Sequence, residues 1–337
     1  EYHLDEVIVV EDIKRKYNII DLHCDTITKL YQTKKNLIKN DCHIDVNKLI
    51  KGQYLLQCFA IFLHQKKENV YEMFDKYYDF YKKEVESNSL YLKEVLSYND
   101  LIKTKSENKI GCLLSIEEGE VLNNNILKLD ELYKKGVRMI TLTWNFPNCL
   151  GTGNINLNNE IEDFQKLKPN VNEGLTGFGK KVVKRMNELG MIIDVSHLSD
   201  KGFFDVIEIS SQPIVASHSN SRKIQNVIRN LTDEMILAIH QNKGVVGINY
   251  CSDFISDNKG NQIKDIVRHI QHFKELGCLD NVALGSDFDG IDTPNGLDDC
   301  SKMSLLYESL ISEGFSMNEI QKIFFKNFIR VLKIVLK

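Results

Sequence analysis

The sequence predicts an α/β fold in which eight parallel strands alternate with helices and close into a (β/α)8 TIM barrel. Eight short apolar runs bounded by polar residues are spread along the 337 residues, and such runs are typical of strands buried on both faces. Most of them are separated by segments with helical periodicity, which favours a parallel sheet. An open doubly wound sheet is the alternative, but no G-x-G-x-x-G motif follows the first run.

The elements are expected in a regular order. Strands are predicted over residues 18–21, 54–62, 110–116, 138–143, 191–195, 213–217, 245–250 and 281–286. Helices are predicted over residues 70–85, 127–135, 178–189, 232–241 and 263–276, and three of these run into a glycine at positions 136, 190 and 277. Glycine ends a helix readily because it adopts the left-handed conformation without a steric cost.

We expect residues 1–337 to form a single barrel domain with an N-terminal extension over residues 1–17. Residues 145–175 interrupt the alternation, because this segment is rich in Asn and Gly and shows no periodicity. It follows the fourth predicted strand, on the face where barrel enzymes carry their active sites. Long loops in compact domains are usually functional, so we interpret this segment as part of the wall of an active site.

Composition argues against several classes of function. The formal net charge of −4 and the mixing of basic with acidic residues give no surface for nucleic acid or an anionic membrane. No apolar stretch has transmembrane length. The eight cysteines have no paired spacing, which is typical of free thiols in a reducing compartment. Residues 324–337 resemble a closing helix without an anchoring tail. We therefore expect a soluble, cytoplasmic protein.

Side chains that commonly bind divalent metals stand at the ends of four apolar runs. His23 and Asp25 follow the first run, Glu117 ends the third, and His197 and His218 follow the fifth and sixth. Residues at the carboxyl ends of different barrel strands converge on one site, and imidazole and carboxylate are the ligands of zinc hydrolases. The sequence therefore predicts a two-metal centre, with one carboxylate shared between the ions.

Acidic neighbours of these positions leave alternatives open. Glu118 competes with Glu117, because a shift of one residue in strand register turns a side chain to the other face. Asp287 follows the last strand within Gly-Ser-Asp-Phe-Asp-Gly and is predicted to act as a general base or proton shuttle. Asp289 is interpreted as a turn carboxylate before a glycine.

Three further residues are given supporting roles. Asp21 and Asp194 come earlier in their strands and are expected to orient the ligating histidines, as carboxylates commonly do around a metal. Arg229 lies just before the predicted helix over residues 232–241. Its planar fork could clamp a substrate carboxylate, although a surface salt bridge is the ordinary role of such a residue taken alone.

Seven motifs in order resemble the membrane dipeptidase family, also called renal dipeptidase-like zinc peptidases. They are Asp-Leu-His-Cys-Asp-Thr (21–26), Ile-Glu-Glu-Gly (116–119), Gly-Val-Arg-Met-Ile-Thr-Leu-Thr (136–143), Ile-Ile-Asp-Val-Ser-His (192–197), Ala-Ser-His-Ser-Asn (216–220), Ile-Arg-Asn-Leu (228–231) and Gly-Ser-Asp-Phe-Asp-Gly (285–290). The resemblance runs from residue 19 nearly to the C-terminus. Its spacing favours Glu117 over Glu118.

The resemblance implies a barrel of the metal-dependent hydrolase type with two Zn²⁺ ions per chain. By position, His23, Asp25 and Glu117 match the ligands of one metal. Glu117, His197 and His218 match those of the other, with Glu117 bridging the pair.

The resemblance also implies substrate contacts, and two of them depart from the family pattern. Asp287 matches the acid/base residue, and Arg229 matches the residue that binds the C-terminal carboxylate of a dipeptide. Trp144 stands where the best-known members carry a substrate-contacting histidine, and Phe254 lies near where a pocket tyrosine is expected. An indole N–H donates one hydrogen bond but accepts none and carries no charge. We therefore expect Trp144 and Phe254 to contact the substrate and to change which substrates the protein prefers.

The predicted function is hydrolysis of the peptide bond of a dipeptide, with a small peptide as the partner. One alternative is a related binuclear-metal amidase or lactam hydrolase that acts on a specialised metabolite, which Trp144 and the Asn-rich loop motivate. A non-catalytic binding barrel is the other, and the presence of all six chemistry-bearing residues argues against it. The family resemblance also suggests a homodimer.

Overall fold

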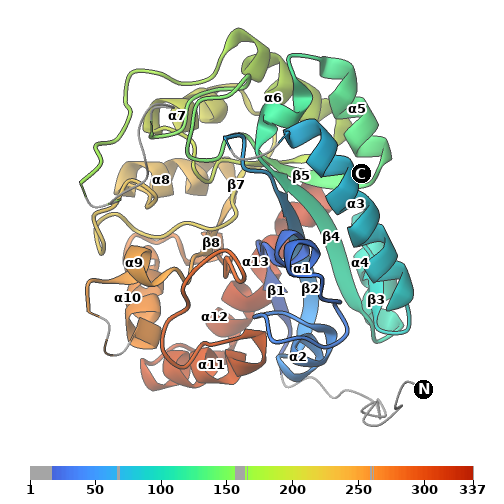
Figure 1. The fold of residues 1–337 in the computed structure, drawn as a ribbon. Coiled ribbons are helices and arrows are strands. Elements are labelled where there is room, and N and C mark those ends of the chain that lie inside the picture. The colour runs from blue at the N-terminus through green and yellow to red at the C-terminus, as the bar shows by residue number, and fades with distance from the viewer. Residues whose placement is uncertain are drawn as a thin grey trace.

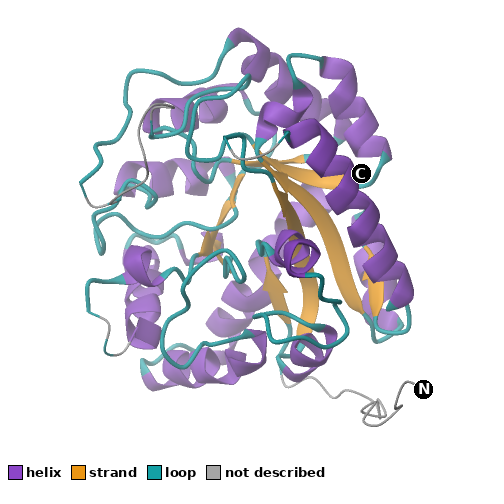
Figure 2. Ribbon diagram, in the orientation of Figure 1, coloured by secondary structure: helices purple, strands orange, loops and turns teal. Residues whose placement is uncertain are grey.

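A closed ring of parallel strands forms the centre of the molecule (Figures 1 and 2). The computed structural model describes residues 17–66, 69–155, 164, 166–258, 260 and 262–336. Within them the sheet order is β2-β1-β9-β8-β7-β6-β5-β4-β3, and an additional pairing of β2 with β4 closes eight strands into a barrel. The predicted α/β class and (β/α)8 barrel are confirmed.

All eight predicted strands are present, and one more was not predicted. The strands are β1 (Ile19–Asp21), β2 (Tyr54–Phe62), β3 (Leu92–Glu94), β4 (Ile110–Glu117), β5 (Val137–Thr141), β6 (Ile192–Asp194), β7 (Val215–Ala216), β8 (Val245–Ile248) and β9 (Val282–Leu284). The additional strand, β3, pairs only with β4 at the outside of the ring. Only its first residue is buried, so it carries no apolar run to reveal it.

Helices follow most strands and cover the outside of the barrel (Figure 2). They are α1 (Thr26–Thr33), α2 (Val46–Lys51), α3 (Val70–Ser87), α4 (Tyr98–Ser106), α5 (Ile126–Lys134), α6 (Gly177–Leu189), α7 (Asp200–Ile209), α8 (Asp233–Asn242), α9 (Ser252–Ile255), α10 (Gln262–Glu275), α11 (Met303–Ser312), α12 (Met317–Gln321) and α13 (Asn327–Val335). The five predicted helices correspond to α3, α5, α6, α8 and α10. The glycines after α5, α6 and α10 have φ of +98°, +77° and +75°, which is the expected left-handed termination.

The core has two parts because successive strand residues point to opposite faces. On β4, Leu113 belongs to a cluster that contains the apolar face of α13, whereas Cys112 and Leu114 belong to the larger cluster beneath the outer helices. Polar side chains of α13 fix where that helix lies. Asn327 Nδ2 donates to the carbonyl of Val282, and Arg330 donates to the carbonyl of Asp280 just before β9. The helix therefore closes the amino end of the barrel and leaves the carboxyl end open.

Two expectations about segments fall partly outside the described residues. Of the N-terminal extension, only Tyr17 is described. It is buried, with its ring stacked on that of Tyr307 at 5.0 Å between centroids. The loop over residues 145–175 is described except for residues 156–163 and 165.

Two expectations from composition concern the cysteines and the membrane. All eight cysteines are free thiols, as their spacing indicates. Among the described residues, no helix combines the length and the apolar character needed to cross a membrane.

Candidate metal centre and active site

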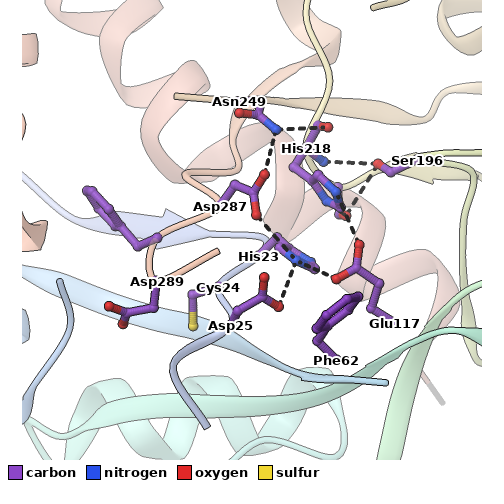
Figure 3. A network of polar contacts seen from close by, with 12 residues as sticks. His23, Cys24, Asp25, Phe62, Glu117, Ser196, His218, Asn249, Asp287 and Asp289 are labelled. Atoms are coloured by element: carbon purple, nitrogen blue, oxygen red, sulfur yellow. Dashed lines mark hydrogen bonds and ion pairs between the residues drawn. The ribbon is translucent and has the colours of Figure 1, made fainter. Parts of the chain in front are cut away.

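The five predicted metal ligands meet at the carboxyl end of the barrel. Figure 3 shows four of them, and His197 joins them through its contact with Glu117. His23 and Asp25 follow β1, Glu117 is the last residue of β4, and His197 and His218 follow β6 and β7. Four of these side chains are no more than 8% exposed, and Asp25 alone is partly open. Strand order therefore brings together side chains that lie far apart in the sequence.

The two oxygens of Glu117 face two different groups of ligands. Oε2 lies 3.3 Å from His23 Nε2, which is itself 3.5 Å from Asp25 Oδ1. Oε1 lies 2.9 Å from His197 Nε2 and 3.5 Å from His218 Nε2. This carboxylate thus stands between two sets of donors, as a bridging ligand must.

Hydrogen bonds set the tautomers of two histidines. Ser217 Oγ donates to Asp194 Oδ2 at 2.5 Å, so its oxygen accepts a hydrogen bond from the protonated Nδ1 of His218 at 2.8 Å. His197 Nδ1 lies 2.7 Å from Asn145 Oδ1, an acceptor, and must also carry the proton. The Nε2 atom of each imidazole therefore carries no proton and presents a lone pair. These lone pairs face each other at a distance of 2.8 Å.

The arrangement fits divalent cations. Two facing lone pairs repel each other unless a cation lies between or beside them. Among the described residues, both ring nitrogens of His23 and Oδ1 of Asp25 are buried without a hydrogen-bond partner, which is costly unless they bind an ion. Ligand atoms lie within 4.8 Å of one another in the groups His23, Glu117, His218 and His23, Asp25, Asp287.

The electrostatics of the protein groups also favour a bound cation. Burial raises the pKa of Glu117 to about 8, with Asp25 adding to the rise and His23 opposing it. Burial also lowers the pKa of His197 and His218 well below the usual value. A cation beside them stabilises the ionised carboxylate and the neutral imidazoles, which are the forms that ligate metals.

Asp287 lies on the loop after β9, beside the ligands. Its Oδ2 accepts a hydrogen bond of 2.9 Å from Asn249 Nδ2, and its Oδ1 lies 3.8 Å from His23 Nε2. Burial raises the pKa of Asp287 to about 7, and Asp25 raises it further, whereas His23 and Asn249 lower it. The backbone φ of Asp287 is +62° and that of His197 is +68°. Non-glycine residues in this region cost free energy and cluster at functional sites.

Two buried aspartates clamp the serines that precede functional residues. Asp194 accepts from the backbone N–H of Ser217 at 2.8 Å as well as from its hydroxyl. Asp21 accepts from the N–H of Ser286 at 2.8 Å and from its hydroxyl at 2.6 Å. Asp194 thus orients His218 through Ser217, as expected in outline. Asp21 fixes the chain just before the acid/base candidate, and its hydrogen bond to His23 goes to the backbone N–H and not to the imidazole.

We predict that Ser217→Ala weakens the binding of a divalent cation such as Zn²⁺ by roughly 10- to 100-fold, the usual effect of losing a partner that orients a ligand. The substitution removes the acceptor that holds the proton on His218 Nδ1. Competition with a chromogenic zinc chelator measures the change. The exposed Ser312→Ala variant is the control. Equal zinc affinities in the two variants would show that Ser217 does not orient His218 for metal binding.

The acidic alternatives point away from the ligands. Glu118 turns to the other face, where its Oε1 accepts from the backbone N–H of Glu120 at 2.9 Å and from Asn148. Asp289 accepts from Thr26 Oγ1 at 2.6 Å and from the backbone N–H of His43 at 2.7 Å. Glu118 therefore anchors the loop after β5, and Asp289 makes the contacts of a turn carboxylate.

A cavity of about 730 Å³ opens over the ligands, and the three predicted substrate-contacting residues line it. Arg229 is 4% exposed, donates to the carbonyl of His218 at 3.2 Å, and has no partner for Nε among the described residues. Its guanidinium carbon lies 5.7 Å from the ring centroid of Phe254. Trp144 packs edge-on against Phe62, with 5.1 Å between ring centroids. A buried cation with a free donor beside an open cavity is suited to an anionic group.

Three residues of the site could not be recognised in the sequence. Asn145 bonds to His197 across 52 positions, and Asn249 bonds to Asp287 across 38. Gly290 packs so closely that a β-carbon there would lie 2.1 Å from Asp25 Oδ2 and 3.0 Å from Asp287 Oδ1. Asn145 sits in the predicted active-site loop and Gly290 in the last motif, but neither position indicates such a contact.

Gly290→Ala is therefore expected to weaken the binding of a divalent cation such as Zn²⁺ by roughly tenfold or more, because the new methyl group must displace Asp25. Isothermal titration of the metal-free protein with Zn²⁺ measures this. Gly177→Ala is the control, since a β-carbon there meets nothing within 4 Å. Unchanged affinity in the Gly290 variant would mean that Asp25 can move without loss of the metal.

A closed barrel with histidines and carboxylates converging at its carboxyl end defines the class of metal-dependent hydrolases. The family model for membrane dipeptidase, peptidase family M19, matches residues 9–337. The chain belongs to this family, and its general activity is that of a dipeptidase among the metallopeptidases.

Two relatives are similar in sequence, and one solved structure shares the fold. An uncharacterised protein in the pqqA 5′ region of Klebsiella pneumoniae is 34% identical over 246 residues, covering 72% of this chain and 88% of that protein. An uncharacterised dipeptidase of Schizosaccharomyces pombe is 30% identical over 307 residues, covering 86% and 72%. A metallopeptidase of Rhodobacter sphaeroides, liganded with a phosphinate mimic of L-Ala-D-Ala, superposes with a TM-score of 0.86 at 21% identity, covering 95% of this chain and 100% of that one.

Proposed function

We propose that this protein is a zinc-dependent dipeptidase whose two Zn²⁺ ions are bridged by Glu117. The observation that carries the proposal is the two-sided environment of that carboxylate. One oxygen faces His23 and the other faces His197 and His218, while the tautomers of the latter two leave lone pairs directed at the same region. His23 and Asp25 would hold one ion with Glu117, and His197 and His218 would hold the other.

When bound, such a metal pair polarises the scissile carbonyl and activates a water molecule as the nucleophile. The chain supplies the proton transfer. Asp287 accepts a proton as the nucleophile attacks and donates it to the leaving amine. Asn249 holds Oδ2 of Asp287, so Oδ1 is the oxygen turned toward the ligands and available for the proton.

Arg229 supports a restriction to short substrates. Its buried guanidinium lines the cavity, with an Nε that has no partner among the described residues. A free C-terminal carboxylate is the group that a guanidinium pairs with most strongly. A carboxylate held there, next to the scissile bond, limits the substrate to a dipeptide and excludes internal peptide bonds.

Steady-state hydrolysis of a dipeptide panel tests the proposal. We expect cleavage by the zinc-loaded protein, loss of cleavage after treatment with a chelator, and recovery when Zn²⁺ is returned. We expect no cleavage of longer peptides with amidated C-termini, either at N-terminal bonds or at central ones. Absence of metal-dependent cleavage of every dipeptide would overturn the proposal.

A related amidase or lactam hydrolase is the second candidate, favoured by the aromatic Trp144 at the edge of the metal centre. Turnover of one cyclic or acylated amide with no turnover of simple dipeptides would select it. The expectations of a cytoplasmic protein, of a homodimer, and of no nucleic-acid or membrane partner stay predictions.

A further inference from the structure

The cavity over the metal centre has aromatic walls made of two pairs of rings. Phe62 and Trp144 form one pair, and Phe164 and Phe254 form the other, each with ring centroids 5.1 Å apart and edge-to-face. Phe62, Trp144 and Phe164 are only partly buried. Their rings therefore keep apolar surface that a bound side chain can cover, and covering such surface is favourable.

The ring pair that contains Phe254 faces the C-terminal half of the substrate, which bears the carboxylate. The guanidinium of Arg229 lies 5.7 Å from the ring of Phe254. In the proposed function Arg229 binds the terminal carboxylate and Asp287 protonates the leaving amine. Both groups act on the C-terminal residue, so that residue lies on the side of Asp287 and Phe254.

The pair Phe62 and Trp144 lies on the other side of the metal ligands. Phe62 at the end of β2 is the register partner of Glu117 at the end of β4. Figure 3 shows Phe62 against Glu117, across His23 from Asp287. A dipeptide with its leaving amine at Asp287 therefore directs its N-terminal residue toward Phe62 and Trp144.

Trp144 is held firmly in this wall. Its ring packs edge-on against Phe62. The centroid of the indole lies 5.5 Å from that of Phe146, 4.8 Å from that of His64 and 6.2 Å from that of His197. A fixed indole beside the ligands presents a flat apolar surface. It offers no charge and no hydrogen-bond acceptor to a polar side chain.

We propose that Trp144 and Phe62 determine specificity by forming a subsite for an aromatic or large apolar side chain on the N-terminal residue of the dipeptide. This inference rests on the proposed function. The two rings carry no positive charge, so burying an acidic side chain against them is costly. The expected order of kcat/KM is Phe-Ala, then Ala-Ala, then Asp-Ala.

Substitutions in the aromatic pair test the subsite. We expect Trp144→Ala to lower kcat/KM for Phe-Ala by roughly tenfold or more, since filling an apolar pocket discriminates by about that factor. Values for Ala-Ala and Ala-Phe should fall by less than about threefold. Phe62→Ala should have the same pattern, and Trp144→Phe should restore much of the preference. Tyr78→Ala, a partly buried aromatic residue on α3 away from the cavity, is the control.

The outcomes separate this inference from the function beneath it. Equal losses for all three dipeptides, or a loss confined to Ala-Phe, would overturn the subsite while leaving the dipeptidase intact. Failure of the unmodified zinc-loaded protein to cleave any dipeptide would overturn the proposed function, and the subsite with it.

A binding measurement gives a second readout that does not depend on turnover. Trp144 is the chain's one tryptophan, so its emission reports directly on this wall. We expect phosphinate mimics of Phe-Ala and Ala-Ala to shift the emission of the zinc-loaded protein, with the Phe-Ala mimic binding roughly tenfold tighter. Phe62→Ala should remove that difference. Equal affinities in the unmodified protein would contradict the inference.

Discussion

Replacing Glu117 by glutamine is expected to reduce kcat/KM for dipeptides by about a thousandfold or more and to lower the zinc content from about two ions per chain to one or none. The amide keeps the size of the side chain but offers one neutral oxygen instead of two charged ones. Metal-ion catalysis is worth several kcal/mol, and ~4 kcal/mol corresponds to about a thousandfold in rate. Plasma emission spectroscopy on the dialysed protein measures the zinc content.

Glu118→Gln is the matched control, because Glu118 is the next residue on the same strand end and is also buried. Its side chain bonds to Asn148 and to the backbone of Glu120 and does not face the ligands. Zinc content and kcat/KM should stay near those of the unmodified protein. The opposite pattern, with Glu118 needed for zinc and Glu117 dispensable, would show that the register of β4 is wrong.

Asp287→Asn is expected to lower kcat by roughly 10²- to 10⁴-fold, the contribution of a positioned general acid and base, while leaving about two zinc ions bound. The asparagine preserves the volume and can still meet Asn249, but it cannot carry the proton. Because the ligands of both ions remain, a fall in kcat with full metal content separates proton transfer from metal binding.

The exposed Asp75, paired with Lys135 on the outside of the barrel, supplies the control as Asp75→Asn, for which unchanged kcat is expected. If Asp287→Asn instead lost one zinc ion and kept the kcat of the remaining loaded protein, Asp287 would be a ligand and not the acid/base residue. Zinc content and kcat measured together therefore decide whether Asp287 is the acid/base residue or a metal ligand.

The strands and the candidate ligands at their ends could be located from the sequence because one physical pattern marks both. A strand buried on both faces needs a continuous apolar run, and a polar residue directly after it must lie at the open end of the barrel. His23 and His218 follow such runs and Glu117 ends one, and the structure places the three side chains together. The short β3 has one buried residue and therefore left no pattern to find.

The residues that support the ligands could not be predicted in the same way. Asn145 and Asn249 act through hydrogen bonds to residues 52 and 38 positions away, beyond the ends of neighbouring strands, and such pairings appear only when the strands are placed. Gly290 matters because of the space that Asp25 and Asp287 occupy beside it. For Trp144 the sequence could indicate a substrate contact, whereas its edge-to-face packing on Phe62 depends on the register of β2 and β4.

The most direct measurement of the central claim is anomalous diffraction at the zinc absorption edge from crystals of the zinc-loaded protein. We predict two peaks on either side of the Glu117 carboxylate, one beside His23 and Asp25 and the other beside His197 and His218. A single peak, or two peaks of which either lies away from Glu117, would contradict the bridged two-metal centre.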